Sequence, residues 1–250
     1  MRKIGLICIP NKSSMRGRRI SITCEECQVK GISKFGTLCN ESLEAINYNK
    51  SCTAYKKGQI LFHEDTRPLG VFCVNKGKLK VYKTGDDGKD QIIQISRPGD
   101  LLGYRAMIGE DLYPVTAEAL EDVQVCFVPK TEFVRLLDSS KEFSNLLLKE
   151  ACHELSKMTE MLTNLAQKTV RERLAVSLLM LNDVYKENKN EEDFAEINLT
   201  REDLANIVGT ATETIIRLLH DFKEEKLIKT NGRKIMVLEP DNLVKVGNIY

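Results

Sequence analysis

Apolar residues recur at helical spacing twice between residues 200 and 223, with a glycine between the two stretches. Thr200 can cap the first helix with its hydroxyl, and Gly209 ends that helix. Thr210 and Glu213 are spaced as a capping box that opens the second helix. Two capped helices joined by so short a turn predict a helix-turn-helix unit. Their predicted inner faces are formed by Leu204, Ile207, Val208, Ile215, Leu218, Leu219 and Phe222.

A predicted hairpin follows the two helices. Leu227–Lys229 and Ile235–Leu238 are apolar runs, and Asn231-Gly232 between them is a strong signal for a tight turn. We interpret this hairpin as a wing. A helix-turn-helix unit places its second helix in the major groove of double-stranded DNA, so this region predicts a DNA-binding domain.

The outer face of the second helix carries the residues expected to contact DNA. Arg217 can donate two hydrogen bonds to O6 and N7 of guanine, and Glu213 can accept one from the amino group of cytosine. An alternative is that Glu213 only caps the helix and Arg217 only contacts solvent. The helix-turn-helix frame and the wing favour DNA contact. The predicted set on this face is Thr212, Glu213, Ile216, Arg217 and His220.

A different pattern, of short apolar runs separated by turn residues, extends from about Tyr55 to Lys130. Turns are indicated at Lys76-Gly77 and Pro98-Gly99, among others. This spacing predicts a β-sandwich or jelly roll, whose interior either encloses a ligand or is filled with side chains. The apolar runs are Val71–Val74, Leu79–Tyr82, Ile92–Ile95 and Val123–Val128.

Apolar residues that repeat every seven positions connect the two regions. They predict a long helix with an apolar seam formed by Leu148, Ala151, Leu155, Met158, Leu162 and Leu165. We interpret it as the helix of a parallel homodimer, which would present two recognition helices to a palindromic site. A helix packed on its own domain is the alternative. A further helix is predicted over Thr169–Asn182, with Leu174, Leu178 and Leu181 facing the core.

Composition narrows the class of protein. The length of 250 residues suggests two domains. Because the net charge is only +1, any affinity for nucleic acid must come from local basic patches. The sequence lacks an apolar run of membrane length, so we expect no membrane partner, and eight cysteines in so charged a chain favour a reducing cytoplasm. It also lacks a glycine-rich phosphate loop, an HExxH motif and a GxSxG motif, and its histidines, including His63 and His153, are scattered. We therefore do not expect an enzyme.

The order of β-roll, long helix and winged helix-turn-helix resembles the CRP/FNR family of bacterial transcription regulators. The similar segments are Lys57–Phe62, Gly70–Gly77, Pro98–Gly103 and Glu213–Leu219. The resemblance implies that Arg201 and His220 contact phosphates, that Glu213 and Arg217 read bases, and that Thr212 and Ile216 occupy variable reading positions. It also implies RNA polymerase as a partner.

The implied architecture is an α+β fold in four parts. Residues 1–40 form an N-terminal cysteine-containing segment, whose first 23 residues are basic and expected to be mobile, with Met1–Arg19 as a poorly ordered tail. Residues 41–142 form the jelly-roll β-roll sensor domain. Residues 143–168 form the dimerisation helix. Residues 169–250 form the winged helix-turn-helix domain, with an acidic connecting loop over Glu187–Glu196.

The segment after Gly103 bears on the signal. The cyclic-nucleotide branch of the family has a glutamate there for the ribose and an arginine soon after for the phosphate. Here Gly103 is followed by Tyr104-Arg105-Ala106-Met107, without that glutamate, and Arg105 lies at the wrong point of the motif. Burying a phosphate without its cation costs several kcal/mol, so we do not expect cyclic AMP (cAMP) to bind.

The cysteines suggest another signal. In the oxygen-sensing branch, three N-terminal cysteines and one β-roll cysteine hold a 4Fe–4S cluster, for which thiolates are the usual ligands. Cys24 and Cys27 match the close pair, and Cys126 matches the distant ligand. Cys39 is the third candidate, at a wider spacing than the family's. The possible substitutes are Cys8, Cys52 and Cys73.

Several alternatives are open at this stage. Four thiolates also suit zinc, and Cys73, Cys126 and Cys152 suit small buried apolar positions. Cys24 and Cys27 then form a redox pair or have no role. The signal is accordingly oxygen or redox state through the cysteines, or a small-molecule effector other than cAMP bound in the β-roll. The last alternative is a ligand-independent DNA binder.

Overall fold

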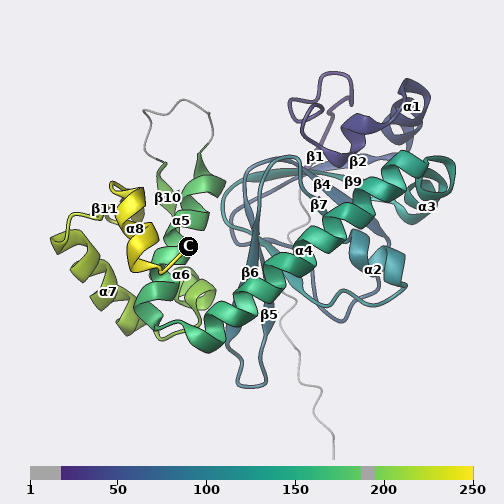
Figure 1. The fold of residues 1–250 in the computed structure, drawn as a ribbon. Helices are drawn as coiled ribbons and strands as arrows, with labels where there is room; N and C mark the ends of the chain where they lie inside the picture. Colours follow the sequence, from purple (N-terminus) through teal and green to yellow (C-terminus); the bar gives the residue numbers. More distant parts are fainter. Residues whose placement is uncertain (1–17, 187–194, 250) are drawn as a thin grey trace, which may run out of the picture.

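The computed structural model describes residues 18–186 and 195–249 (Figure 1). Cys8, the predicted tail up to residue 17 and the acidic loop up to residue 194 lie outside the described residues. The prediction of an unpaired tail is wrong for β1 (Arg18–Ile20), which pairs antiparallel with β2 (Ser51–Tyr55). No helix within the described ranges is long and apolar enough to cross a membrane.

Two antiparallel sheets form the β-roll. The five-stranded sheet has the order β1-β2-β9-β4-β7, and the four-stranded sheet has the order β3-β8-β5-β6. Apolar side chains such as Val74, Leu79, Val81 and Val125 fill the space between the sheets, which confirms the predicted jelly roll. The remaining strands are β3 (Ile60–Phe62), β4 (Gly70–Lys76), β5 (Leu79–Thr84), β6 (Asp90–Ser96), β7 (Leu101–Leu102), β8 (Thr116–Ala119) and β9 (Val123–Pro129).

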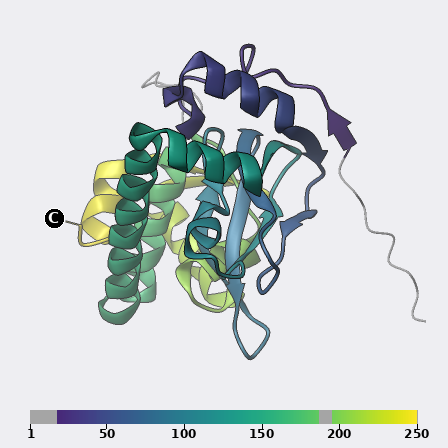
Figure 2. The same cartoon turned by 90° about the vertical axis from the view of Figure 1, so that its right-hand side faces the viewer.

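Helices cover the other face of the five-stranded sheet. The short helix η1 (Lys34–Thr37), α1 (Asn40–Asn49) and α3 (Lys130–Ser139) bury apolar side chains against Val71 and Val128 of the sheet. In both views α1 lies beside α3 (Figures 1 and 2). The helix α2 (Tyr104–Gly109) follows β7 directly. The N-terminal cysteines therefore belong to a segment that is packed on the β-roll.

The predicted long helix is α4 (Lys141–Gln167). Its N-cap is Ser140, whose hydroxyl accepts a hydrogen bond from the amide of Phe143. Its first turns are buried, because Phe143 and Leu147 pack against η1 and α3. From there α4 runs from the β-roll to the C-terminal domain (Figure 1).

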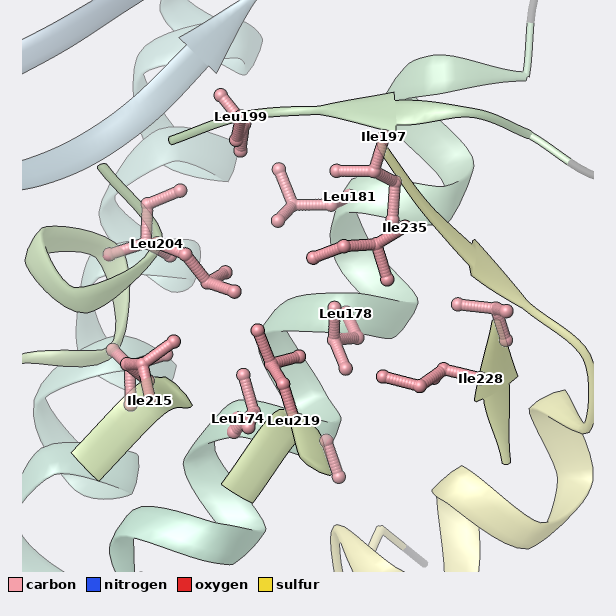
Figure 3. Close-up of a cluster of buried hydrophobic side chains, with 14 of the residues drawn as sticks. Leu174, Leu178, Leu181, Ile197, Leu199, Leu204, Ile215, Leu219, Ile228 and Ile235 are labelled. Carbon is pink, nitrogen blue, oxygen red and sulfur yellow. The ribbon is translucent and has the colours of Figure 1, made fainter. Parts of the chain in front are cut away.

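The C-terminal domain forms around α5 (Val170–Tyr185), which begins at Thr169 with a capping box to Glu172. Leu174, Leu178 and Leu181 are fully buried, as predicted, and Figure 3 shows them at the centre of the domain core. The helix-turn-helix is α6 (Arg201–Val208) and α7 (Thr212–Glu224), and the wing is β11 (Ile228–Asn231) and β12 (Lys234–Val237). β10 (Ile197–Asn198) and α8 (Pro240–Val246) complete the domain.

The predicted helix-turn-helix is confirmed, with two local corrections. Thr200 caps α6 and Gly209 ends it in the left-handed region, but α7 begins at Thr212 after Ala211, so Thr210 does not form the predicted capping box. The wing turn lies one residue later than predicted, because Asn231 pairs with Lys234 and leaves Gly232, with its φ of 58°, inside the turn.

The C-terminal domain packs directly on the β-roll. Tyr82, Ile92 and Ile95 belong to the same buried cluster as the helix-turn-helix core. Nζ of Lys80 lies 2.9 Å from Oδ1 of Asp203 on α6 and 3.5 Å from Oε1 of Glu118. Burial opposes the charged form of Lys80, but these carboxylates outweigh it and raise the pKa of Lys80. The ammonium therefore stays charged at neutral pH.

We predict that Leu178→Ala destabilises the protein by about 2–5 kcal/mol, because it leaves a cavity in a core that cannot collapse around it. Met180→Ala on the same helix is the control, since Met180 is 44% exposed and its loss should cost less than about 1 kcal/mol. Urea unfolding followed by circular dichroism measures both. Equal losses of free energy of unfolding would contradict the central place of Leu178.

Candidate nucleic-acid interface and sensor sites

The outer face of α7 presents the predicted DNA-contacting residues together. Glu213, Ile216, Arg217 and His220 are exposed and recur at spacings of three and four residues, so they share one face of the helix. Ile216 is 54% exposed, which is high for an isoleucine on a helix whose other face is buried. Thr212, at the first turn, is half-buried. Figure 1 shows α7 on the side of the domain turned away from the β-roll.

Two arginines of α5 hold the helix-turn-helix in place. Arg171 forms hydrogen bonds of 2.7 and 2.8 Å with Glu225, just after α7, and its guanidinium lies 4.7 Å from the centre of the Phe222 ring. Arg173 donates to the carbonyl oxygens of Val208 (2.9 Å), Gly209 (3.2 Å) and Lys168 (3.0 Å). Because Lys168 follows α4 directly, Arg173 connects the end of the long helix to the turn before the recognition helix. The sequence alone did not indicate this role of Arg173.

Arg201, for which the resemblance implied a phosphate contact, also makes contacts within the chain. Its guanidinium donates to the carbonyl oxygens of Gly232 (3.0 Å) and Arg233 (3.3 Å), and burial lowers its pKa. Arg201 therefore ties the start of α6 to the tip of the wing. The exposed cations around the recognition helix that are available for phosphates include Lys223, Lys226, Lys229 and Arg233.

The predicted seam of α4 is largely uncovered in this chain. Leu155 is 65% exposed and Leu162 is 69% exposed, whereas Ala151 packs partly against the β-roll helices. A single soluble domain rarely leaves a stripe of large apolar side chains in water, so an exposed stripe marks an interaction surface. The other exposed seam residues are Leu148, Met158 and Leu165.

The β-roll pocket after Gly103 is nearly full. The rings of Phe62 and Tyr113 stack at 4.1 Å between their centres, and the cavity left beside them has a volume of about 30 Å³. Ligand sites usually measure about 300–1,000 Å³. Nε of Arg105 lies 3.1 Å from Oε2 of Glu154 on α4, whose pKa is raised by burial. The cation nearest this cavity therefore already faces a carboxylate of the same chain.

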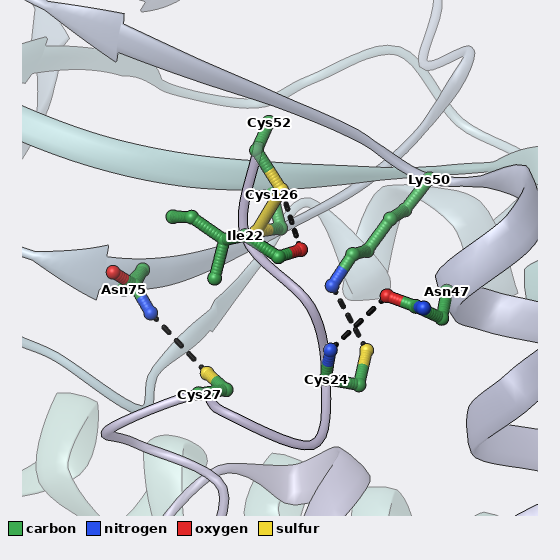
Figure 4. Close-up of a disulfide and its surroundings, with 8 residues drawn as sticks. All are labelled: Ile22, Cys24, Cys27, Asn47, Lys50, Cys52, Asn75 and Cys126. Atoms are coloured by element: carbon green, nitrogen blue, oxygen red, sulfur yellow. Dashed lines mark hydrogen bonds between the residues drawn. A yellow bond between two sulfur atoms is a disulfide. The ribbon is translucent and has the colours of Figure 1, made fainter. Parts of the chain in front are cut away.

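Five cysteines gather at the five-stranded sheet. Cys52 of β2 and Cys126 of β9 form a disulfide, and Cys73 of β4 is paired in register with Cys126. Figure 4 shows Cys24 and Cys27 on the loop beside this disulfide. Nζ of Lys50 lies 2.9 Å from the sulfur of Cys24, and the side-chain amide of Asn75 donates to the sulfur of Cys27 (3.2 Å).

This arrangement does not fit the predicted metal set of Cys24, Cys27, Cys39 and Cys126. A disulfide-bonded Cys126 has no free thiolate to bind a metal. Cys39 is exposed at the start of α1, and its thiol donates a hydrogen bond to the Ser42 hydroxyl. Across residues 18–186 and 195–249, no three His, Cys, Asp or Glu side chains form a group that could hold a metal ion.

Comparison with known proteins agrees with this geometry. A family model described as a cyclic nucleotide-binding domain matches residues 52–140, and one described as a Crp-like helix-turn-helix domain matches residues 172–246. The transcriptional activator protein FnrA of Stutzerimonas stutzeri is 27% identical over 217 residues, which are 86% of this chain and 88% of FnrA. The fumarate and nitrate reduction regulatory protein of Escherichia coli K12 is 28% identical over 231 residues, 91% of each chain.

Solved structures show the same fold. FixK2 from Bradyrhizobium japonicum superposes with a TM-score of 0.70 at 23% identity, covering 79% of this chain and 96% of FixK2. TTHA1359, a CRP/FNR-family regulator from Thermus thermophilus, has a TM-score of 0.66 at 21% identity, covering 79% and 98%. The β-roll, long helix and winged helix-turn-helix define a DNA-binding transcription regulator. The chain belongs to the CRP/FNR family, and its relatives include FNR-type regulators.

Proposed function

We propose that this regulator binds a palindromic operator as a homodimer and responds to redox state through its N-terminal cysteines. The observation that carries the proposal is the exposed face of α7, where Glu213, Arg217 and His220 lie on a helix fixed by a buried opposite face. Arginine and glutamate are side chains that distinguish G·C pairs in the major groove.

The exposed stripe on α4 supports the homodimer. A second copy of the stripe would cover Leu155 and Leu162 by knobs-into-holes packing of two parallel helices. The two-fold axis of such a pair relates the two recognition helices, so each would enter one half-site about one helical turn from the other. Through the family resemblance, RNA polymerase is the expected protein partner at the promoter.

The cysteine cluster supports a redox response. The relatives include a protein called anaerobic regulatory protein in Haemophilus influenzae, 27% identical over 236 residues. Among the described residues the cysteine set does not fit a 4Fe–4S cluster, so we assign the response to the thiols themselves. Operator affinity of the reduced and the oxidised protein tests it, and equal affinities would refute it. The nearly filled pocket argues against a small-molecule effector there.

We predict that Arg217→Ala weakens binding to a selected operator by about 1–3 kcal/mol and relaxes the preference at one base position, because a bidentate contact to guanine is lost. Arg67→Ala, which removes an exposed arginine from a β-roll loop, is the matched control. Electrophoretic mobility shifts with operator variants measure both. Unchanged affinity of Arg217→Ala would show that the recognition helix is assigned wrongly.

Leu155→Glu should produce a monomer with little DNA affinity, because it places like charges across the apolar contact of two α4 helices. The control is Ser156→Glu, which adds the same charge to the next residue, on a different side of the helix. Sedimentation at several protein concentrations measures the mass. A stable Leu155→Glu dimer would place the interface elsewhere.

Cyclic AMP should give no saturable heat at micromolar concentrations in isothermal titration, because the pocket lacks both the space and an unpaired cation for a phosphate. The titration is repeated with the Arg105→Gln variant. Since Arg105 is already paired, neither protein should bind. Saturable binding to the parent protein would mean that Phe62 and Tyr113 move aside for the nucleotide.

A further inference from the structure

Three cysteines form a row across three neighbouring strands. Cys52 of β2 is the register partner of Cys126 of β9, and Cys126 is also the register partner of Cys73 of β4. Register partners in antiparallel strands point to the same face of the sheet. The row therefore lies on one face, the face that η1, α1 and α3 cover, because Cys73 belongs to their buried cluster.

The loop after β1 lies on this row. The carbonyl oxygen of Ile22 is 3.9 Å from the sulfur of Cys52, and the amide of Cys24 donates to the side chain of Asn47 (3.0 Å). Cys24 and Cys27, spaced as a C-x2-C pair, are held beside the disulfide by these contacts and by those of Lys50 and Asn75 (Figure 4). The structure thus places the loop that carries two free thiols beside the sheet disulfide (Figure 4).

The free thiols of this cluster differ in their surroundings. Burial, together with the neighbouring Cys27 and Cys24, raises the pKa of Cys73 to about 12, so Cys73 is a thiol at neutral pH and a poor nucleophile. Cys24 and Cys27 are half-buried and each accepts a hydrogen bond at sulfur, from an ammonium and an amide respectively. The loop thiols are therefore better placed than Cys73 to attack the disulfide.

We propose that Cys24 and Cys27 form a dithiol that exchanges with the Cys52–Cys126 disulfide. The deprotonated sulfur of Cys24 attacks Cys52, forming a Cys24–Cys52 bond and releasing Cys126, which takes up a proton. The deprotonated sulfur of Cys27 then attacks Cys24, forming a Cys24–Cys27 bond and releasing Cys52, which is protonated in turn. Two protons move from the loop to the sheet, and the net oxidation state of the chain is unchanged.

The exchange brings the oxidised pair to the surface. A small dithiol reductant can then attack the half-buried Cys24–Cys27 bond, giving two electrons and two protons and leaving as its own disulfide. The reverse sequence, with a low-molecular-weight disulfide as oxidant, restores the Cys52–Cys126 bond. The inference deepens the proposed redox response, and its consequence for DNA binding rests on that proposed function.

The loop is connected to α4. Nζ of Lys34, in η1, lies 2.5 Å from a carboxylate oxygen of Glu150, and the rings of Phe35 and Phe143 stack at 5.6 Å. η1 follows the cysteine loop within a few residues, so a change of disulfide in the loop acts on the elements packed against the first half of α4. The same helix carries the exposed seam.

The test traps the mixed disulfide in the full-length protein. Cys27→Ser removes the second attacking sulfur, so the Cys24–Cys52 intermediate should accumulate at pH 8 under argon. The free thiols are blocked with N-ethylmaleimide, and the disulfide-linked peptides are identified by mass spectrometry. We expect about tenfold more Cys24–Cys52 peptide than in Cys39→Ser, the matched control, which removes an exposed thiol from the start of α1. The parent protein, titrated with limiting dithiothreitol, should show both Cys52–Cys126 and Cys24–Cys27.

Three results would overturn the exchange. One is a Cys27→Ser protein that retains only Cys52–Cys126. Another is linkage of Cys24 to Cys39 or Cys152 as often as to Cys52, and the third is a parent protein that never yields Cys24–Cys27. Circular dichroism establishes that each variant is folded. Operator affinity is measured separately on the same samples, so exchange without a change in affinity would refute the redox response but not the exchange.

Discussion

The arrangement of the C-terminal half depends on the burial of one face of α5. Leu174, Leu178 and Leu181 lose all contact with water, and α6, α7 and the wing pack around them. The apolar side chains of α7 are buried in this core, so its outer face is free to carry polar residues. Arg171 and Arg173 extend from the same helix and fix the C-terminal end and the turn of the helix-turn-helix, respectively, by hydrogen bonds. One apolar face thus sets the orientation of every side chain expected to meet DNA.

The β-roll contributes to that orientation through a polar contact in an apolar surrounding. In the first turn of α6, the amide of Asp203 donates to the Thr200 hydroxyl, and the Asp203 carboxylate accepts from that hydroxyl and receives the Lys80 ammonium from β5. Removing either partner of such a pair leaves a largely buried charge uncompensated. The β-roll and the DNA-binding domain therefore share both a core and an ion pair. A change in the β-roll acts on α6 as well as on α4.

Local signals predicted most of the fold, whereas contacts between distant residues escaped the sequence. The cap at Thr200, the buried leucines of α5 and the strands of the β-roll follow from spacing and turn residues. The Cys52–Cys126 pair joins residues 74 apart and depends on the register of β2 against β9, which a single sequence does not reveal. The contacts of Arg201 with the wing tip also join residues 31 and 32 positions apart, so the sequence did not indicate them. The exposed outer face of α7 was predicted correctly because helical periodicity alone defines it.

The connection that Arg173 makes between the end of α4 and the end of α6 has a mechanical consequence. A helix of 27 residues is about 40 Å long. A small tilt of α4 at its β-roll end therefore moves its other end by a larger distance. A tilt of about 3° at one end displaces the other by about 2 Å, a large fraction of a hydrogen-bond length. A flexible joint would absorb this displacement, but three carbonyl oxygens held by one guanidinium make the joint stiff. Small movements near η1 are thus amplified along α4 before they reach the recognition helix.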